Sequence, residues 1–265
     1  MNQKDKNKLI TIIKEASLLG GSKALEYFRA SDLVVSNKSK SAFDPVTPAD
    51  ELSEEIMTSF IKSLRPLDTI YGEEKGISAG KSGYTWMLDP IDGTRAFISG
   101  APVWTVLVAL NEGDKPILGA IFQPFTKELV IGGFNRCQYF LSGAQRETKT
   151  RTCEKIENAV LFTTFPEIGS SKERLIFQSV SEKVKLTRYG MDAYAFLLLA
   201  LGHVDLVIEA GLKPYDVRAP IAVIEAAGGV VTDWQGKKVD PEGGQILACG
   251  DRILHKKVVE ILNTF

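Results

Sequence analysis

The most constraining feature of the chain is a short run in which two aspartates, a proline and a glycine follow an apolar segment: Thr85-Trp86-Met87-Leu88-Asp89-Pro90-Ile91-Asp92-Gly93-Thr94. The apolar residues predict a strand, and Pro90, which has no N–H to donate, predicts that the strand ends there. Asp92 follows Asp89 by three positions, and Gly93 lacks a Cβ, so nearby N–H groups can face open space. Carboxylates, the Ile91 carbonyl and bare amides at a strand end favour a site for a hard cation and a phosphate. Asp-Gly is also a common turn signal, so a turn or helix-cap role for Asp92 is the alternative.

Bulk composition places the chain among ordinary globular proteins. It has 265 residues, 44% hydrophobic and 25% charged, which is enough for one large domain or two lobes that share a core. A net charge of −1 gives no electrostatic reason to expect a nucleic-acid or membrane partner. The three cysteines are scattered, which argues against a zinc ribbon or a disulfide framework and predicts a reducing, cytoplasmic location.

The first half of the sequence predicts helices followed by a strand meander. Polar residues 1–8 are expected to fray, and apolar residues recur at helical spacing from 9 to 28. Lys14 and Glu15 interrupt this apolar segment, so it is interpreted as a helix and not as an export signal. Residues 36–43 predict a loop or an exposed hairpin. Thr47 as N-cap and Pro48 at the first helical position predict a second helix, which leaves Asp50 free for another task.

The remaining elements follow from hydrophobic patterning. Strands are expected at 68–71, 103–110, 116–122, 128–133 and 138–141, and a lobe boundary in the polar segment 143–157. Strands and helices then alternate, which predicts a sheet with helices on its faces. The strands are expected at 159–163, 184–188, 205–209, 230–233 and 246–249, and the helices at 171–180, 193–201, 217–227 and 253–262. If Asp216 caps the third of these helices, Pro220 removes its first intrahelical donor.

Three motifs in order carry a resemblance to a known family: Gly72-Glu73-Glu74, Asp89-Pro90-Ile91-Asp92-Gly93-Thr94, and Tyr215-Asp216-Val217 before Ala227-Gly228-Gly229. Over nearly the whole chain they resemble the inositol monophosphatase superfamily of Mg²⁺-dependent, typically lithium-sensitive phosphomonoesterases. The resemblance implies a layered αβαβα sandwich. It also implies an N-terminal α+β lobe, 1–145, with most metal ligands, and a C-terminal α/β lobe, 146–265, that supplies Asp216 and pocket residues. Members of the family are commonly homodimers.

The resemblance also implies a metal site with two or three Mg²⁺ ions. Its ligands would be Glu73, Asp89, the Ile91 carbonyl, Asp92 and Asp216. Glu74 would be an outer ligand or bind a third ion, although two glutamates in a surface loop are also commonly just solvated. The ligand set holds no Cys or His, which disfavours zinc. Without cations, carboxylates crowded at one point would raise one another's pKa.

The catalytic roles implied by the family centre on Thr94. Thr94 would position a water for in-line attack. Asp50, hydrogen-bonded to Thr94, would take or share the proton of the Thr94 hydroxyl, and Glu73 would take part in catalysis. The amides of Gly93 and Thr94 would hold the phosphate. The segment 75–83 corresponds to a flexible flap over the site.

Other residues are similar to those of the histidinol-phosphate phosphatase branch: Arg95-Ala96-Phe97, where the inositol branch usually has a second Thr and an Asn, Tyr189 to Tyr194, and Gly202 to Asp216. An ammonium-bearing substrate would suit Asp192 and Glu209. Glu209 also matches a residue that contacts the alcohol in the inositol enzymes, and Asp192 could equally cap the helix that begins beside it. Arg95 would bind the phosphate or form a salt bridge with an acidic neighbour.

The expected function is therefore Mg²⁺-dependent hydrolysis of a small phosphate ester, namely histidinol phosphate in histidine biosynthesis. The alternative within enzymes is an inositol-1-monophosphatase or a broad sugar or nucleotide phosphatase. A non-catalytic binding protein on the same scaffold is the remote alternative, and the intact acidic set argues against it.

Overall fold

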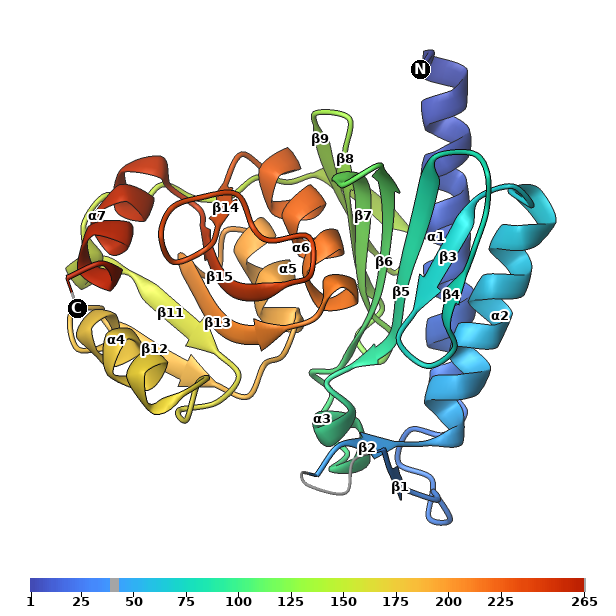
Figure 1. Cartoon of the computed structure of the whole chain (residues 1–265), viewed down its shortest axis with the longest axis horizontal. Helices are drawn as coiled ribbons and strands as arrows, with labels where there is room; N and C mark the ends of the chain where they lie inside the picture. Colours follow the sequence, from blue (N-terminus) through green and yellow to red (C-terminus); the bar gives the residue numbers. More distant parts are fainter. Residues whose placement is uncertain (39–42, 265) are drawn as a thin grey trace.

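The computed structural model describes residues 1–38 and 43–264 and stacks five layers in the order helix, sheet, helix, sheet, helix (Figure 1). This is the expected αβαβα sandwich. The larger sheet has eight strands, and all neighbours in it are antiparallel except β3 and β5. In spatial order the strands are β10 (Ala144–Glu147), β9 (Arg136–Leu141), β8 (Glu128–Gly133), β7 (Lys115–Gln123), β6 (Thr105–Glu112), β5 (Tyr84–Asp92), β3 (Thr69–Gly72) and β4 (Gly76–Ser78).

Helices α1 (Gln3–Leu25) and α2 (Pro48–Leu64) cover the outer face of this sheet. Helix α1 begins much earlier than expected, because the Asn2 side chain accepts a hydrogen bond from the Asp5 N–H at 2.9 Å and caps the helix. The prediction that residues 1–8 fray is therefore wrong. Between the two helices, β1 (Ser36–Asn37) pairs with β2 (Pro45–Val46). This is the exposed hairpin expected at 36–43, of which residues 39–42 lie outside the described part of the chain.

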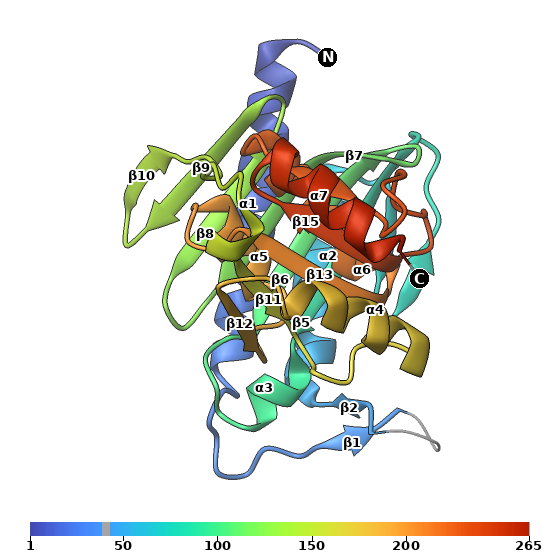
Figure 2. The ribbon, with the colours of Figure 1, turned by 90° about the vertical axis from the view of Figure 1, so that its left-hand side faces the viewer.

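The smaller sheet has five strands and mixed directions. Strand β11 is parallel to both of its neighbours, whereas β15 is antiparallel to both of its own. In spatial order the strands are β12 (Leu186–Tyr189), β11 (Val160–Thr163), β13 (Leu206–Leu212), β15 (Gly244–Cys249) and β14 (Val230–Thr232). A short 3-10 helix, η1 (Ile156–Asn158), precedes β11. Helices α4 (Ser171–Ser181) and α7 (Arg252–Leu262) lie in front of this sheet in Figure 2 and form the outermost layer.

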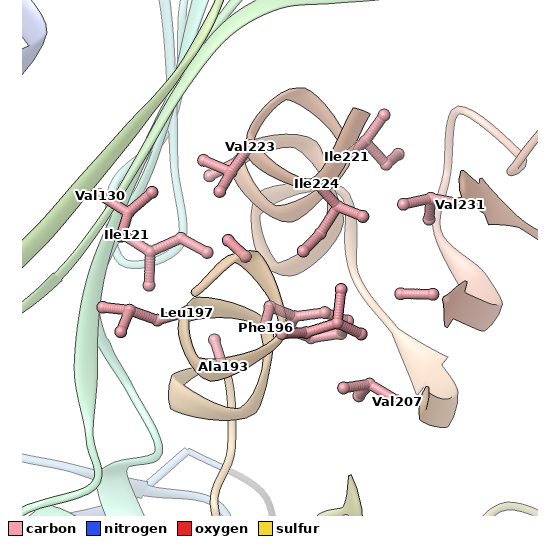
Figure 3. Close-up of a cluster of buried hydrophobic side chains, with 14 of the residues drawn as sticks. Ile121, Val130, Ala193, Phe196, Leu197, Val207, Ile221, Val223, Ile224 and Val231 are labelled. Carbon is pink, nitrogen blue, oxygen red and sulfur yellow. The ribbon is translucent and has the colours of Figure 1, made fainter. Parts of the chain in front are cut away.

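The two sheets are held together by a buried core around α5 (Tyr194–Ala200) and α6 (Pro214–Ala226). In Figure 3, Ile121 and Val130 of the larger sheet point toward these helices, and Val207 and Val231 approach from the smaller one. Gly119 and Gly132 let α6 approach closely, because a Cβ at either position would overlap the helix backbone. Each large aliphatic side chain buried here stabilises the fold by about 1.5–3 kcal/mol. The core therefore fixes α6 relative to β5, and these two elements carry the site.

Two segments differ from the sequence prediction. Residues 75–83, expected to be a flap, contain β4 and pair with β3 at the sheet edge. Residues 144–147, inside the expected lobe boundary, form β10. The division into lobes at residue 145 stays a prediction. Among the described residues, no helix is both long and apolar enough to cross a membrane.

Candidate active site

Strand β5 does not end at Pro90 but continues to Asp92 through a β-bulge. Asp89 is paired with Leu107 of β6 and Asp92 with Thr105, so β5 contains one extra residue between the two pairs. Pro90 lies in this bulge, where a missing N–H costs no ladder hydrogen bond. In a regular strand, residues three apart point to opposite faces. The extra residue brings the two carboxylates to the same side.

The third carboxylate, that of Asp216, comes from the first turn of α6. The helix begins at Pro214 and not at 217 as expected, so Asp216 is inside it, where its Oδ2 accepts a hydrogen bond from the Lys213 N–H at 2.7 Å. Pro220 cannot supply the N–H that the Asp216 carbonyl would accept in a regular helix. The first turn nevertheless forms, which resolves the conflict noted in the sequence.

These aspartates meet at one point. One oxygen each of Asp89, Asp92 and Asp216 lies within 4.8 Å of the other two. Glu73 lies beside this group, and all four residues line one cavity of about 310 Å³. We call it the metal cavity; its other lining residues are Lys38, Asp44, Ile91, Gly93, Thr94, Lys213 and Tyr215. The structure thus brings together Glu73, Asp89, Ile91, Asp92 and Asp216, the inner ligands that the family resemblance implied. Neither Glu74, the implied outer ligand, nor any of residues 75–83 lines the cavity.

A lysine from the β1–β2 hairpin and a glutamate from α2 hold the Glu73–Glu74 turn. The Lys38 ammonium lies 3.1 Å from Glu73 Oε1 and 2.6 Å from Glu74 Oε1. The buried Glu54 carboxylate accepts hydrogen bonds from the N–H groups of Glu74 and Lys75 at 2.7 and 2.9 Å. Sequence analysis missed both Lys38 and Glu54, because nothing in their local pattern points to the turn they contact.

Asp50 carries out two tasks at once. Thr47 caps α2 as expected, and its N–H and hydroxyl both donate to Asp50 Oδ2, at 2.8 and 2.7 Å. Asp50 is thus not free, but its other oxygen lies 3.4 Å from the Thr94 hydroxyl. That hydroxyl is also 3.2 Å from the Ile91 carbonyl, and it has one proton to donate to one of them at a time. The expected Asp50–Thr94 pair is present, next to the carbonyl proposed as a ligand.

Burial and like charges dominate the electrostatics of the metal cavity. Burial raises the pKa of Asp89 well above its usual range, and the charges of Glu73, Asp92 and Asp216 add to the effect. Burial likewise raises the pKa of Asp216 to about 7. Burial lowers the pKa of Lys38, but the charges of Glu73 and Glu74 outweigh it and raise that pKa above its ordinary value.

The donor set fits a hard divalent cation. It consists of carboxylates and a carbonyl, the ligands that Mg²⁺ prefers, and no Cys or His is among the described residues that line the cavity. A cation among Asp89, Asp92 and Asp216 would offset their repulsion and the cost of burying their charge. Lys38 neutralises only the glutamate side of the cavity.

A second cavity of about 240 Å³ adjoins the first, and Asp92 and Asp216 line both. We call it the leaving-group cavity; its other lining residues are Thr164, Phe165, Asp192, Ala193, Phe196, Glu209, Ala210, Gly211 and Leu212. Glu209 is buried and well hydrogen-bonded: it accepts from the Thr164 N–H and hydroxyl at 2.7 and 2.9 Å and from the Thr163 hydroxyl at 3.3 Å. Burial raises the pKa of Glu209 to about 8 despite these bonds.

Asp192 lines the leaving-group cavity and lies close to Gly93, which lines the metal cavity. Its φ of 45° is left-handed, and α5 is capped at Ala193 without a side-chain hydrogen bond, so the alternative of a capping aspartate is wrong. A Cβ on Gly93, itself left-handed with φ 86°, would lie 2.9 Å from the Asp192 carboxylate. The Ala193 N–H donates to Asp92 Oδ2 at 2.6 Å. Burial raises the pKa of Asp192 to about 6, and the nearby Arg95 opposes the shift.

Arg95 lines neither cavity. Its guanidinium donates to the Phe43 carbonyl at 2.6 Å and packs over the ring of Phe165, with Cζ 5.2 Å from the ring centroid. A direct substrate contact by Arg95 therefore stays a prediction.

Sequence analysis also missed Thr164 and Phe165, because the loop after β11 carries no motif.

Comparison with known proteins identifies the family. A model of the inositol monophosphatase family matches residues 5–264. The chloroplastic bifunctional phosphatase IMPL2 of Arabidopsis thaliana is 44% identical over 247 residues, which cover 89% of this chain and 70% of that protein. A histidinol-phosphatase of Streptomyces coelicolor is 29% identical, covering 90% and 91%. The solved structure of an inositol monophosphatase from Zymomonas mobilis superposes with a TM-score of 0.84 at 31% identity, covering 99% of both chains.

The layered fold and its acidic cavity thus define the class as a metal-dependent phosphomonoesterase. The chain belongs to the inositol monophosphatase family, and it is a phosphatase that acts on small phosphate esters.

Proposed function

We propose that this protein hydrolyses histidinol phosphate to histidinol, as a step of histidine biosynthesis, with Mg²⁺ in the metal cavity. The observation that carries the proposal is the charge of the leaving-group cavity. Two carboxylates beyond the shared aspartates, Asp192 and Glu209, line it, and no Lys or Arg is among its described lining residues. Burial favours the neutral form of Glu209, but an ammonium group on the alcohol would favour the charged form and bind to it, whereas a polyol offers only hydroxyls. The name of the Streptomyces coelicolor relative supports the same substrate.

The mechanism assigns each cavity a different part of the ester. When bound, Mg²⁺ supplies the positive charge that acidifies water and stabilises the phosphoryl oxygens. The Thr94 hydroxyl can then accept a hydrogen bond from the attacking water and donate its own proton to Asp50, 3.4 Å away. The amides of Gly93 and Thr94, at the start of the short helix α3 (Thr94–Ile98), hold phosphate oxygens. Asp192 and Glu209 orient the alcohol.

The test is a comparison of kcat/KM for histidinol phosphate, inositol 1-phosphate and a nucleoside monophosphate, each with Mg²⁺ and with EDTA. We expect histidinol phosphate to be preferred by about a hundredfold or more, because two charge-assisted hydrogen bonds are each worth about 1.5–3 kcal/mol. Preference for inositol 1-phosphate would show that Glu209 binds a hydroxyl of a polyol. The name of the Zymomonas mobilis structure, an inositol monophosphatase, supports this alternative. Equal rates with all esters would indicate a broad phosphatase, and no turnover of any ester would contradict the mechanism.

Two further family traits belong to the proposal. We propose a homodimer, which light scattering on the purified protein would test. We also propose inhibition by lithium, which should appear as loss of turnover at a fixed Mg²⁺ concentration.

A further inference from the structure

Among the described residues that line the leaving-group cavity, Phe165 is the one aromatic side chain that is substantially exposed. It lines the cavity with 44% of its surface accessible, whereas Phe196 on the same cavity is only 3% exposed. Phe165 directly follows Thr164, whose N–H and hydroxyl both bond to Glu209. Those two hydrogen bonds fix the backbone beside the ring. An exposed ring on an anchored backbone, at the wall of a cavity that also holds carboxylates, offers a flat surface to a ligand.

Arg95 packs on this ring from outside the cavity. Its guanidinium lies over the Phe165 ring, and it also lies over the ring of Phe43, with Cζ 5.9 Å from that centroid. The hydrogen bond to the Phe43 carbonyl and the short helix α3 fix the guanidinium at one end. A planar cation that lies over an aromatic ring limits the movement of that ring. Arg95 therefore supports the ring without contacting the cavity.

We propose that Phe165 is a specificity-determining residue on which the planar ring of the substrate alcohol stacks, with Arg95 as the positioning residue behind it. The inference rests on the proposed function, since histidinol carries both an ammonium group and a flat imidazole. Asp192 and Glu209 recognise the ammonium charge, and Phe165 recognises the planar imidazole ring. A polyol phosphate or an aliphatic amino-alcohol phosphate lacks that plane and gains nothing from Phe165.

The experiment compares the wild-type enzyme with Phe165→Leu on two substrates. Histidinol phosphate and leucinol phosphate share the phosphate and the ammonium group, but only the first has a planar ring. We expect Phe165→Leu to lower kcat/KM for histidinol phosphate about five- to tenfold, mainly through KM, because stacking contacts have this size. For leucinol phosphate we expect a change of less than about twofold, because Leu preserves apolar contact.

Each result separates the two claims. Equal losses with both substrates, or no loss with either, would overturn the stacking role while leaving the proposed function intact if wild-type enzyme still prefers histidinol phosphate. Wild-type enzyme that hydrolyses both esters equally well would overturn the stacking role alone, because leucinol phosphate carries the same ammonium group. Wild-type enzyme that does not hydrolyse histidinol phosphate would overturn the proposed function. Arg95→Lys is the matched variant for the positioning role of Arg95. It keeps a positive charge near Asp192 but lacks the planar guanidinium. It should reproduce the selective loss seen in Phe165→Leu, and full retention of the preference would overturn the role of Arg95.

Discussion

The metal cavity and the leaving-group cavity share Asp92 and Asp216, yet they satisfy their charged groups in opposite ways. In the metal cavity, burial and the like charges of the half-buried Asp92 and Asp216 raise the pKa of the buried Asp89. In the leaving-group cavity, the buried Glu209 accepts hydrogen bonds from the adjacent Thr163 and Thr164. The first cavity needs a cation from outside, whereas the second is largely satisfied by the protein. Changes to the first should therefore abolish turnover, and changes to the second should alter the choice of substrate.

The largest effect is expected from Asp89→Asn. It removes one of the three clustered carboxylates and so weakens metal binding. The bound metal stabilises the charge of the transition state by several kcal/mol, so kcat should fall by about a thousandfold or more. The fold should be kept, because the change also removes a like charge from a buried cluster. Steady-state kinetics and a thermal melt measure both quantities. The exposed Asp114→Asn is the matched control and should keep full activity; near-normal turnover by Asp89→Asn would remove this cluster from the mechanism.

Metal removal tests the same cavity without a mutation. Mg²⁺ at about a hundred times its Kd should stabilise the folded protein by about 2.7 kcal/mol, because the site exists only in the folded state. For a chain of this size that corresponds to a rise in Tm of roughly 5–10 °C. EDTA should reverse the rise, and Asp89→Asn should show a smaller one. A Tm that does not respond to Mg²⁺ in the wild-type protein would contradict a metal site here.

Asp192→Asn is expected to act on the leaving-group cavity alone. Asn tolerates the left-handed backbone found at residue 192, so the substitution removes charge with little strain. We expect kcat/KM for histidinol phosphate to fall about 10- to 100-fold, the size of one charge-assisted hydrogen bond. With a phosphate ester that carries no ammonium group, such as glycerol 2-phosphate, kcat should change by less than about threefold. An equal fall for both esters would mean that Asp192 serves the metal cavity and that the two regions are not separable.

The smallest effect is expected from Thr164→Val. This change removes the hydroxyl that donates to Glu209 Oε1 but keeps the shape of the side chain and the N–H bond at the same oxygen. The loss of one hydrogen bond to a buried carboxylate should lower stability by about 1–2 kcal/mol and raise KM for histidinol phosphate about three- to tenfold. The kcat should stay nearly constant. A matching change at the half-buried Thr58, which lies in α2 and lines neither cavity, should alter neither quantity.

Much of the fold and of the metal cavity could be predicted from the sequence. The Thr47 cap, the β6–β7 hairpin and the alternating second half are encoded by residues close together in the chain, so local patterns reveal them. The motifs around Glu73, Asp89 and Asp216 likewise identified residues that line one cavity. Sequence spacing failed at the ends of elements: α1 and α6 both begin earlier than predicted, because hydrogen bonds from their first turns were not visible in the hydrophobic pattern.

What the sequence determined by itself is the chemistry available: oxygen ligands without Cys or His, a threonine beside an aspartate, and the order of motifs that marks the family. Only the tertiary structure decided how those groups meet. It placed Pro90 in a bulge that turns two aspartates to one side, brought Lys38 to the Glu73–Glu74 turn, and put Arg95 behind Phe165 instead of inside a cavity. The reason is physical: strand register and contacts between distant segments depend on how sheets and helices pack, and no short stretch of sequence contains that information.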